Sequence, residues 1–188
     1  DITRGNLDPL PISVSPFFTD EISKEKIKKN LDIDNLGLEI SKVIENNLRK
    51  TGLFDTLDNE SFLQKPDIAH LKPRFEDWRL IKAQALVTGK LLIKDGKLKV
   101  EFRLWDLAAA KEMTALAFTT SPSNWRRVAH IISDKIYERL TGEEGYFDTR
   151  IIYVSESGPK NQRIKKLAIM DQDGANTKYL TLGNELVL

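Results

Sequence analysis

The sequence contains no cysteine and no long hydrophobic run. Without cysteine the chain cannot form a disulfide, bind zinc through thiolates or attack a substrate with a thiol. The longest apolar runs fall far short of the roughly 20 residues that a membrane-spanning helix needs, so no direct membrane insertion is expected. An excess of charge of one sign is also lacking, since 29 basic residues balance 28 acidic ones. Nothing in that balance predicts binding to nucleic acid or to an anionic membrane surface.

The composition is otherwise that of an ordinary globular protein. Hydrophobic residues make up 40% of the chain and charged residues 30%, which are usual proportions for a folded domain. Domains commonly run about 100–150 residues. A length of 188 residues therefore suits one domain with an additional piece.

The spacing of apolar residues predicts two main helices. The first begins near Leu36 and ends at Gly52, which can adopt the positive φ of a helix C-cap. The second follows Ser123 or Asn124, either of which can cap it, and ends at Gly142. Each helix has one apolar stripe that can pack on a sheet. The stripes are Leu36, Ile40, Val43, Ile44 and Leu48, and Trp125, Val128, Ala129, Ile132, Ile136 and Leu140.

Alternating and apolar segments predict strands between these helices and before them. Asp95-Gly96 is a strong signal for a two-residue hairpin turn, and Leu98, Val100, Phe102 and Leu104 alternate with polar residues after it. The expected strands are Ile12–Ser15, Phe54–Leu57, Ala85–Ile93, Leu98–Trp105 and Lys111–Thr119.

Three other segments have weaker signals. The charge run Lys24–Lys29 is interpreted as a solvated face, residues 58–73 as a loop with a helical turn, and Arg74–Lys82 as a short helix. The whole pattern predicts an α/β domain, a mixed sheet of about five strands with the two main helices on it. Its antiparallel meander argues against a doubly wound nucleotide-binding fold.

The end of the chain predicts a different kind of structure. Residues 150–154, 164–170 and 178–181 suggest three short strands, with turns at Gly158-Pro159 and Asp173-Gly174. The Asp171–Asp173 segment resembles the start of a calcium loop, but such a loop needs an oxygen ligand at position five and a Glu at position twelve. Those positions hold Ala175 and Leu182, so a turn is expected rather than a metal site.

No enzyme signature appears in the sequence. His130 and Asp134 lie four residues apart on the second main helix and can meet on one face. A catalytic or metal site needs a third partner, which no spacing signals, so a helix-surface pair is the interpretation. Nucleophile elbows, phosphate loops and dinucleotide motifs are missing. No catalytic residue, no metal and no cofactor is therefore predicted.

An ordered set of short segments resembles the TolB family, the periplasmic component of the bacterial Tol-Pal system. No segment is specific alone, but their order along nearly the whole chain is. The segments are Asp1–Gly5, Pro11–Phe17, Trp78–Gly89, Asn124–Arg127 with Ala129-His130, Ser133-Asp134, Leu140–Gly142, Gly145–Phe147 and Thr149–Val154.

The resemblance implies three parts. They are an extended N-terminal arm at 1–11, a TolB-type α/β domain at 12–144, and the start of an incomplete C-terminal β-propeller at 145–188. It implies a periplasmic location, reached through a signal peptide absent from this sequence. It further implies a junction between the two domains. The implied junction residues are Trp125, His130, Asp134, Phe147 and Arg150.

The resemblance also implies a function without catalysis. The protein would link inner- and outer-membrane partners, maintain outer-membrane integrity and support constriction in cell division. The arm would bind a TolA-type inner-membrane protein, and a Pal-type lipoprotein would bind the propeller and bias the position of the arm. The arm residues implied are Asp1, Ile2, Thr3, Arg4, Leu7, Asp8, Leu10 and Ile12.

Two alternatives come from other classes of protein. One is a periplasmic hydrolase with a propeller, in which the α/β part caps the active site. A Ser-His-Asp set beyond Leu188 would favour it. The other is a small-ligand-binding α/β domain, which requires a deep apolar pocket.

Overall fold

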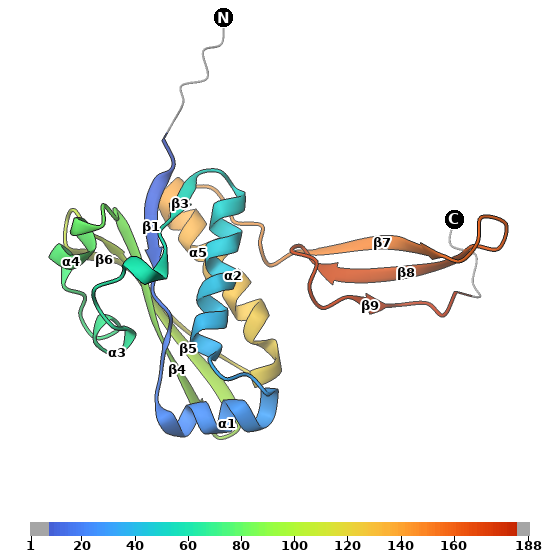
Figure 1. Ribbon diagram of the computed structural model, residues 1–188, viewed down its shortest axis with the longest axis horizontal. Coiled ribbons are helices and arrows are strands. Elements are labelled where there is room, and N and C mark those ends of the chain that lie inside the picture. The colour runs from blue at the N-terminus through green and yellow to red at the C-terminus, as the bar shows by residue number, and fades with distance from the viewer. Residues whose placement is uncertain (1–7, 184–188) are drawn as a thin grey trace, which may run out of the picture. The chain divides into compact units, whose positions relative to one another are not determined.

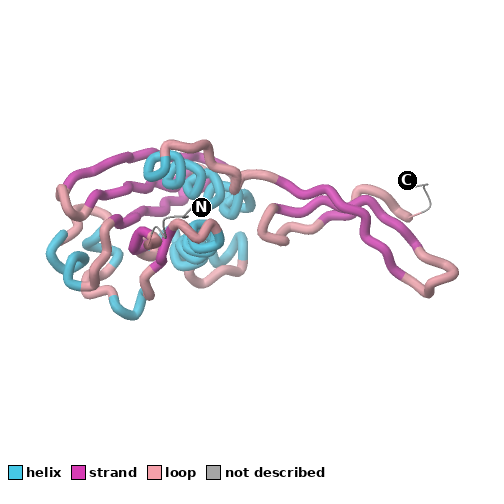
Figure 2. Tube along the Cα trace, turned by 90° about the horizontal axis from the view of Figure 1, so that it is seen from above, coloured by secondary structure: helices cyan, strands magenta, loops and turns pink. Residues whose placement is uncertain are grey.

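A computed structural model describes residues 8–183, which divide after Gly145 into two units (Figure 1). The first unit is a sheet with helices packed against it, and the second contains strands only (Figure 2). The predicted arm residues Asp1, Ile2, Thr3, Arg4 and Leu7 lie outside the described range.

The first unit is built on a six-stranded mixed sheet, which confirms the predicted fold class. Its strand order is β3-β1-β4-β5-β6, and the two-residue β2 pairs with β4 beyond the end of β1. The β1–β3, β1–β4 and β2–β4 pairs are parallel, whereas β4–β5 and β5–β6 are antiparallel. The strands are β1 (Leu10–Val14), β2 (Phe18–Thr19), β3 (Phe54–Thr56), β4 (Ala85–Lys94), β5 (Lys97–Asp106) and β6 (Lys111–Thr120).

The hairpin between β4 and β5 forms as the sequence predicts. Asp95 and Gly96 both have positive φ, 51° and 70°, which is the geometry of a type I′ turn. Its register pairs Lys94 with Lys97 and places Leu98, Val100, Phe102 and Leu104 on one buried face. The predicted meander is therefore confirmed.

The two predicted main helices cover this buried face. They are α2 (Leu36–Lys50) and α5 (Trp125–Thr141), which lie side by side (Figure 1). Asn35 caps α2 by accepting from the Leu38 backbone N–H, and Gly142 ends α5 with a φ of 79°. Asn124 is the N-cap position of α5, after the 3-10 turn η2 (Pro122–Asn124), but its amide bonds to the Thr120 hydroxyl instead of a helix N–H.

One helix was not predicted. The charge run Lys24–Lys29 lies in α1 (Glu21–Leu31), whose exposed side is the expected solvated face. Only Ser23 and Ile27 of this helix are buried, so its apolar stripe is too short to signal a helix. Asp20 caps it through the Ser23 backbone N–H.

A small second core covers the other face of the sheet at one end. Residues 58–83 supply η1 (Asn59–Ser61), α3 (Pro66–Ala69) and α4 (Phe75–Leu80), close to the predicted turn and short helix. Trp78 is almost fully buried, with Ala69, Ala83, Leu86 and Leu107 around it. Gln64 fixes this segment, because its Oε1 accepts from the Trp78 indole N–H and the Arg74 backbone N–H.

The second unit is a three-stranded antiparallel sheet. Its order is β7 (Arg150–Ser157), β8 (Ile164–Asp171) and β9 (Lys178–Tyr179), close to the three predicted strands. Gly158 and Gly174 have φ of 90° and 87° in the connecting turns. In the part of the chain that the structure describes, no helix has the length and apolarity that crossing a membrane requires.

Candidate interaction sites

The root of the N-terminal arm is a strand inside the sheet. Asp8 is exposed, but Leu10 starts β1 two residues before the predicted strand, and its N–H bonds to the Leu53 carbonyl. Ile12 is fully buried and pairs with Thr56 of β3 on one side and with Ala85 of β4 on the other. A partner can therefore reach Asp8 and the residues before it, whereas Ile12 is reached only if the sheet opens.

Two of the predicted junction residues, His130 and Asp134, lie on α5, and His130 is not a surface residue. Its side chain is 2% exposed, and its Nδ1 lies 2.9 Å from the Asn47 side-chain Nδ2. The same amide nitrogen donates to the Ser133 hydroxyl, which in turn donates to the Ala129 carbonyl. The prediction of a helix-surface pair is wrong, because α2 packs over the histidine and places Asn47 against it.

This network fixes the chemistry of the imidazole. The Asn47 Nδ2 is a donor, so His130 Nδ1 must accept and the ring proton lies on Nε2. A neutral histidine held by an amide differs from the arrangement of a hydrolytic triad, in which a carboxylate orients the ring. Asn47 itself was missed. Its signal was a polar residue on the apolar stripe of the first predicted helix, between Val43-Ile44 and Leu48.

The remaining junction residues have local roles. Trp125 begins α5, and the Arg126 guanidinium lies 5.7 Å from the Trp125 ring centre. Phe147 packs against Tyr146, with 4.7 Å between ring centres. Arg150 begins β7 and lies 3.8 Å from an oxygen of Asp171.

The acidic turn of the second unit binds its own backbone and side chains. An oxygen of Asp173 accepts from the Ala175 N–H at 3.1 Å, and Asp171 accepts from the Asn176 amide at 2.5 Å. These bonds, with Gly174 at positive φ, are those of a reverse turn. The interpretation as a turn between strands agrees with this geometry.

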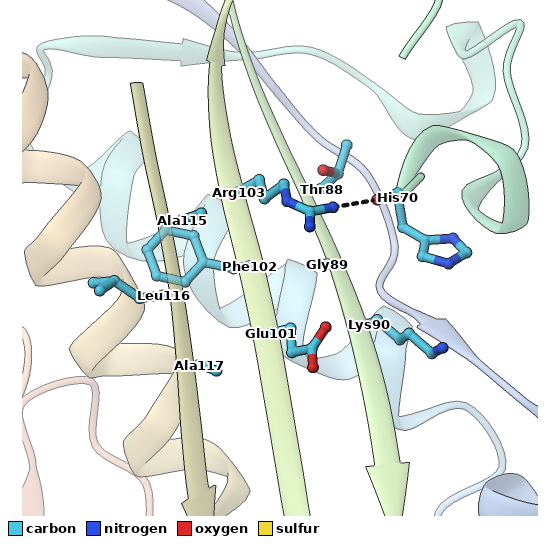
Figure 3. Close-up of a pocket in the computed structure, with 10 residues that line it drawn as sticks. All are labelled: His70, Thr88, Gly89, Lys90, Glu101, Phe102, Arg103, Ala115, Leu116 and Ala117. Atoms are coloured by element: carbon cyan, nitrogen blue, oxygen red, sulfur yellow. Dashed lines mark hydrogen bonds between the residues drawn. The ribbon is translucent and has the colours of Figure 1, made fainter. Parts of the chain in front are cut away.

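A hollow lies on the open face of the meander (Figure 3). Its volume is about 220 Å³, and it is lined by charged and small side chains of β4, β5 and β6 and by His70. Arg103 donates to the His70 carbonyl at 3.0 Å and lies 3.2 Å from Glu112. Glu101 lies 2.6 Å from the Lys99 ammonium, whose hydrogen bond holds the pKa of that carboxyl below its usual value.

The polarity of this hollow bears on the small-ligand alternative. Drug-sized ligands commonly occupy largely apolar pockets of about 300–1,000 Å³. The hollow is smaller and includes Lys90, Glu101 and Arg103. It is therefore not the deep apolar pocket which that alternative requires.

Comparison with known proteins gives a consistent family. The model of the TolB amino-terminal domain matches residues 1–113. The Tol-Pal system protein TolB of Pelagibacter ubique (strain HTCC1062) is 74% identical over all 188 residues, which cover 42% of that protein. The chain thus spans less than half the length of this curated relative.

Two solved structures share the fold. The crystal structure of TolB from Acinetobacter baumannii matches with a TM-score of 0.73 and 22% identity, over 92% of this chain and 38% of that one. The hypothetical protein CT253 from Chlamydia trachomatis matches with a TM-score of 0.52 and 14% identity, over 72% of this chain and 99% of that one. At these identities the two likenesses concern the fold alone.

Proposed function

The chain belongs to the TolB amino-terminal domain family, and on that premise we propose that it is a non-catalytic interaction protein of the Tol-Pal system. It works in the periplasm, between partners in the inner and outer membranes. There it maintains outer-membrane integrity and supports constriction in cell division. The observation that carries the proposal is the identity of 74% to a Tol-Pal protein along the full 188 residues.

The N-terminal arm is the proposed binding segment for a TolA-type inner-membrane protein. Its residues from Asp1 to Asp8 precede β1, whose pairing with β3 and β4 anchors them to the domain. An extended segment next to a fixed strand can add to the sheet of a partner and become ordered when it binds. Leu10 and Ile12 then serve as the anchor of the arm rather than as contacts.

The second unit is the proposed start of a β-propeller. Ile151, Ile152 and Val154 of β7 are 41–62% exposed, and Tyr179 of β9 is 59% exposed. A blade with such faces needs neighbouring blades to bury them. A Pal-type lipoprotein binds the propeller and favours one position of the arm. Such coupling requires different affinities of Pal for the two arm states, typically about 1–3 kcal/mol apart.

Calorimetric titration of the full-length protein with the soluble C-terminal domain of its TolA-type partner tests this role. One variant lacks residues 1–8, which leaves β1 intact, and a matched control carries the same eight residues in scrambled order. The proposal expects binding by the natural protein and none by either variant. Equal binding by all three moves the site to the folded domain, and no binding by any contradicts the proposed partner.

A further inference from the structure

The outer edge of β6 is a long unpaired strand edge. The sheet order ends at β6, and within residues 8–183 no strand pairs with its outer side. In an antiparallel strand the N–H and C=O groups of alternate residues point away from the neighbouring strand. The ten residues of β6 therefore present a row of backbone donors and acceptors that another strand can use.

The sequence of β6 lacks the usual protection of an edge. Charged residues, prolines and bulges normally keep edge strands from pairing with other chains. Lys111 and Glu112 are charged, but from Met113 to Thr120 the strand has neither charge nor proline. The register shift at Leu104/Trp105 lies at the beginning of β6 and leaves Leu116–Thr120 in regular pairing. An open edge of this kind is a binding site or an aggregation hazard.

A groove on the helix side of this edge continues the site. Phe118, Thr119 and Thr120 line it together with Asn124, Arg127, Val128 and Ile131 of α5 and its start, and its volume is about 170 Å³. Leu116 pairs with Phe102 and so faces the same side, where it is 41% exposed. A strand added to β6 would place alternate side chains over Leu116 and into this groove.

The opposite face of the edge also has room. Ala115 and Ala117 are exposed and line the hollow of the open face, where small side chains leave space beside Glu101 and Arg103 (Figure 3). The other alternate side chains of an added strand can lean over these two alanines. Both faces of the same edge are therefore open to an added strand.

The helix beside the edge is basic. Arg127, Ile131, Lys135 and Arg139 are four residues apart on α5 and so share one side of the helix. Arg127 lines the groove at one end, and Arg139 donates to the Met113 carbonyl at 3.2 Å towards the other. Glu138 offsets part of this charge by pairing with Lys135 at 2.8 Å. The net cationic row favours a partner that carries carboxylates.

We propose that the outer edge of β6 and the adjoining side of α5 bind an extended, acidic and apolar segment of a partner protein by strand addition. Backbone hydrogen bonds along β6 supply affinity, and the apolar positions over Leu116 and Phe118 supply register. Carboxylates of the segment pair with the basic row of α5. The site is separate from the N-terminal arm, since β4 and β5 lie between β1 and β6.

The charges favour such a segment over a second copy of this chain. Two copies paired through β6 about a two-fold axis perpendicular to the sheet would both carry α5 on the same face of the joined sheet. Their basic rows would then face each other across the junction, and like charges at close range oppose association. An acidic segment meets no such repulsion.

Fluorescence anisotropy with the full-length protein tests the proposal. The probe is a labelled ten-residue synthetic peptide of alternating valine and aspartate, and the control peptide has lysine for aspartate. The natural protein is expected to bind the acidic peptide saturably and the basic one at least tenfold more weakly. Leu116→Glu is expected to weaken acidic-peptide binding at least tenfold, which corresponds to about 1.4 kcal/mol.

The matched control is Leu80→Glu, the same change at a residue of α4 that is 74% exposed and does not line the groove. This variant is expected to bind as the natural protein does, and circular dichroism checks that both variants fold. Absence of saturable binding up to millimolar peptide overturns the proposal, as does an equal loss in the two variants. A dimer that dissociates in Leu116→Glu during sedimentation overturns it in favour of a second copy.

Discussion

The Asn47 side-chain amide lies 2.9 Å from His130 Nδ1 and links α2 to α5 in the interior of the first unit. The same nitrogen lies 2.9 Å from the Ser133 hydroxyl. Two helices that otherwise meet through apolar stripes thus share one buried polar network. Such a network fixes how the helices align, because each of its groups is costly when left without a partner.

Asn47→Ala is expected to destabilise the protein by about 1–3 kcal/mol, the usual effect of leaving buried polar groups without a hydrogen bond. Urea unfolding followed by circular dichroism measures the change. Asn46→Ala is the matched control, since Asn46 lies next to it on the exposed side of α2. The control is expected to stay within about 0.5 kcal/mol of the natural protein. Similar losses in both variants would contradict the role of the network.

Gly89→Ala is expected to destabilise the protein by about 1–3 kcal/mol, the usual effect of overpacking. A Cβ at this position would overlap the Phe17 ring, whereas a Cβ at Gly37 would overlap the Phe17 backbone carbonyl. A smaller side chain can relieve the first clash only. In the Phe17→Leu background the cost of Gly89→Ala should therefore fall, while the cost of Gly37→Ala should not.

Double-mutant cycles in urea separate these two cases. Each cycle compares the effect of the glycine substitution in the natural and the Phe17→Leu proteins. Equal coupling of Phe17 to both glycines would show that the ring does not set the space at Gly89.

Asp20→Ala is expected to cost about 1 kcal/mol at neutral pH, as loss of a helix cap does. The Ser23 backbone N–H, 2.9 Å from Asp20 Oδ1, holds the pKa of this carboxyl below its usual value. A lowered folded-state pKa gives stability that is present above the unfolded pKa of about 3.9 and is lost as the pH falls through the folded value. The cost of Asp20→Ala should therefore shrink in acid.

Urea unfolding at about pH 7 and about pH 2, on either side of the usual aspartate pKa, measures this difference. Asp8→Ala serves as the control, because Asp8 is an exposed aspartate before β1. A cost of Asp20→Ala that is the same at both pH values would exclude a contribution from the charge of the cap.

Glu45→Gln is expected to stabilise the protein at neutral pH. Partial burial on α2 raises the pKa of Glu45, while the Asn59 amide donates to its Oε1 at 3.1 Å. A raised carboxyl pKa means that the charged form weakens the fold above the folded-state pKa, and that this penalty disappears as the pH falls towards the unfolded value. Glutamine keeps an acceptor for Asn59 and removes the charge.

The gain from Glu45→Gln should therefore be largest near pH 7 and vanish near about pH 4, the usual glutamate pKa. Thermal unfolding at a series of pH values measures it. Glu60→Gln, at an exposed residue of η1, controls for the general effect of removing one negative charge. A gain that persists in acid would contradict the electrostatic origin.

Local pattern was sufficient for much of the first unit. The stripe from Leu36 to Leu48 predicted α2, and Asp95-Gly96 predicted the hairpin between β4 and β5. Both signals act over a few residues, where helix or strand period and turn geometry dominate. The charge run Lys24–Lys29 concealed α1, because that helix buries too little apolar surface to leave a stripe.

The sequence by itself determined the elements and the family. Period, turn residues and an ordered set of short segments are local properties that need no partner in space. Tertiary structure alone decided that β1 lies between β3 and β4, that Ile12 anchors the arm, and that His130 is buried against Asn47. It also left the outer side of β6 open. These features join residues far apart in the chain, and sheet order and helix packing are set by how whole faces bury one another.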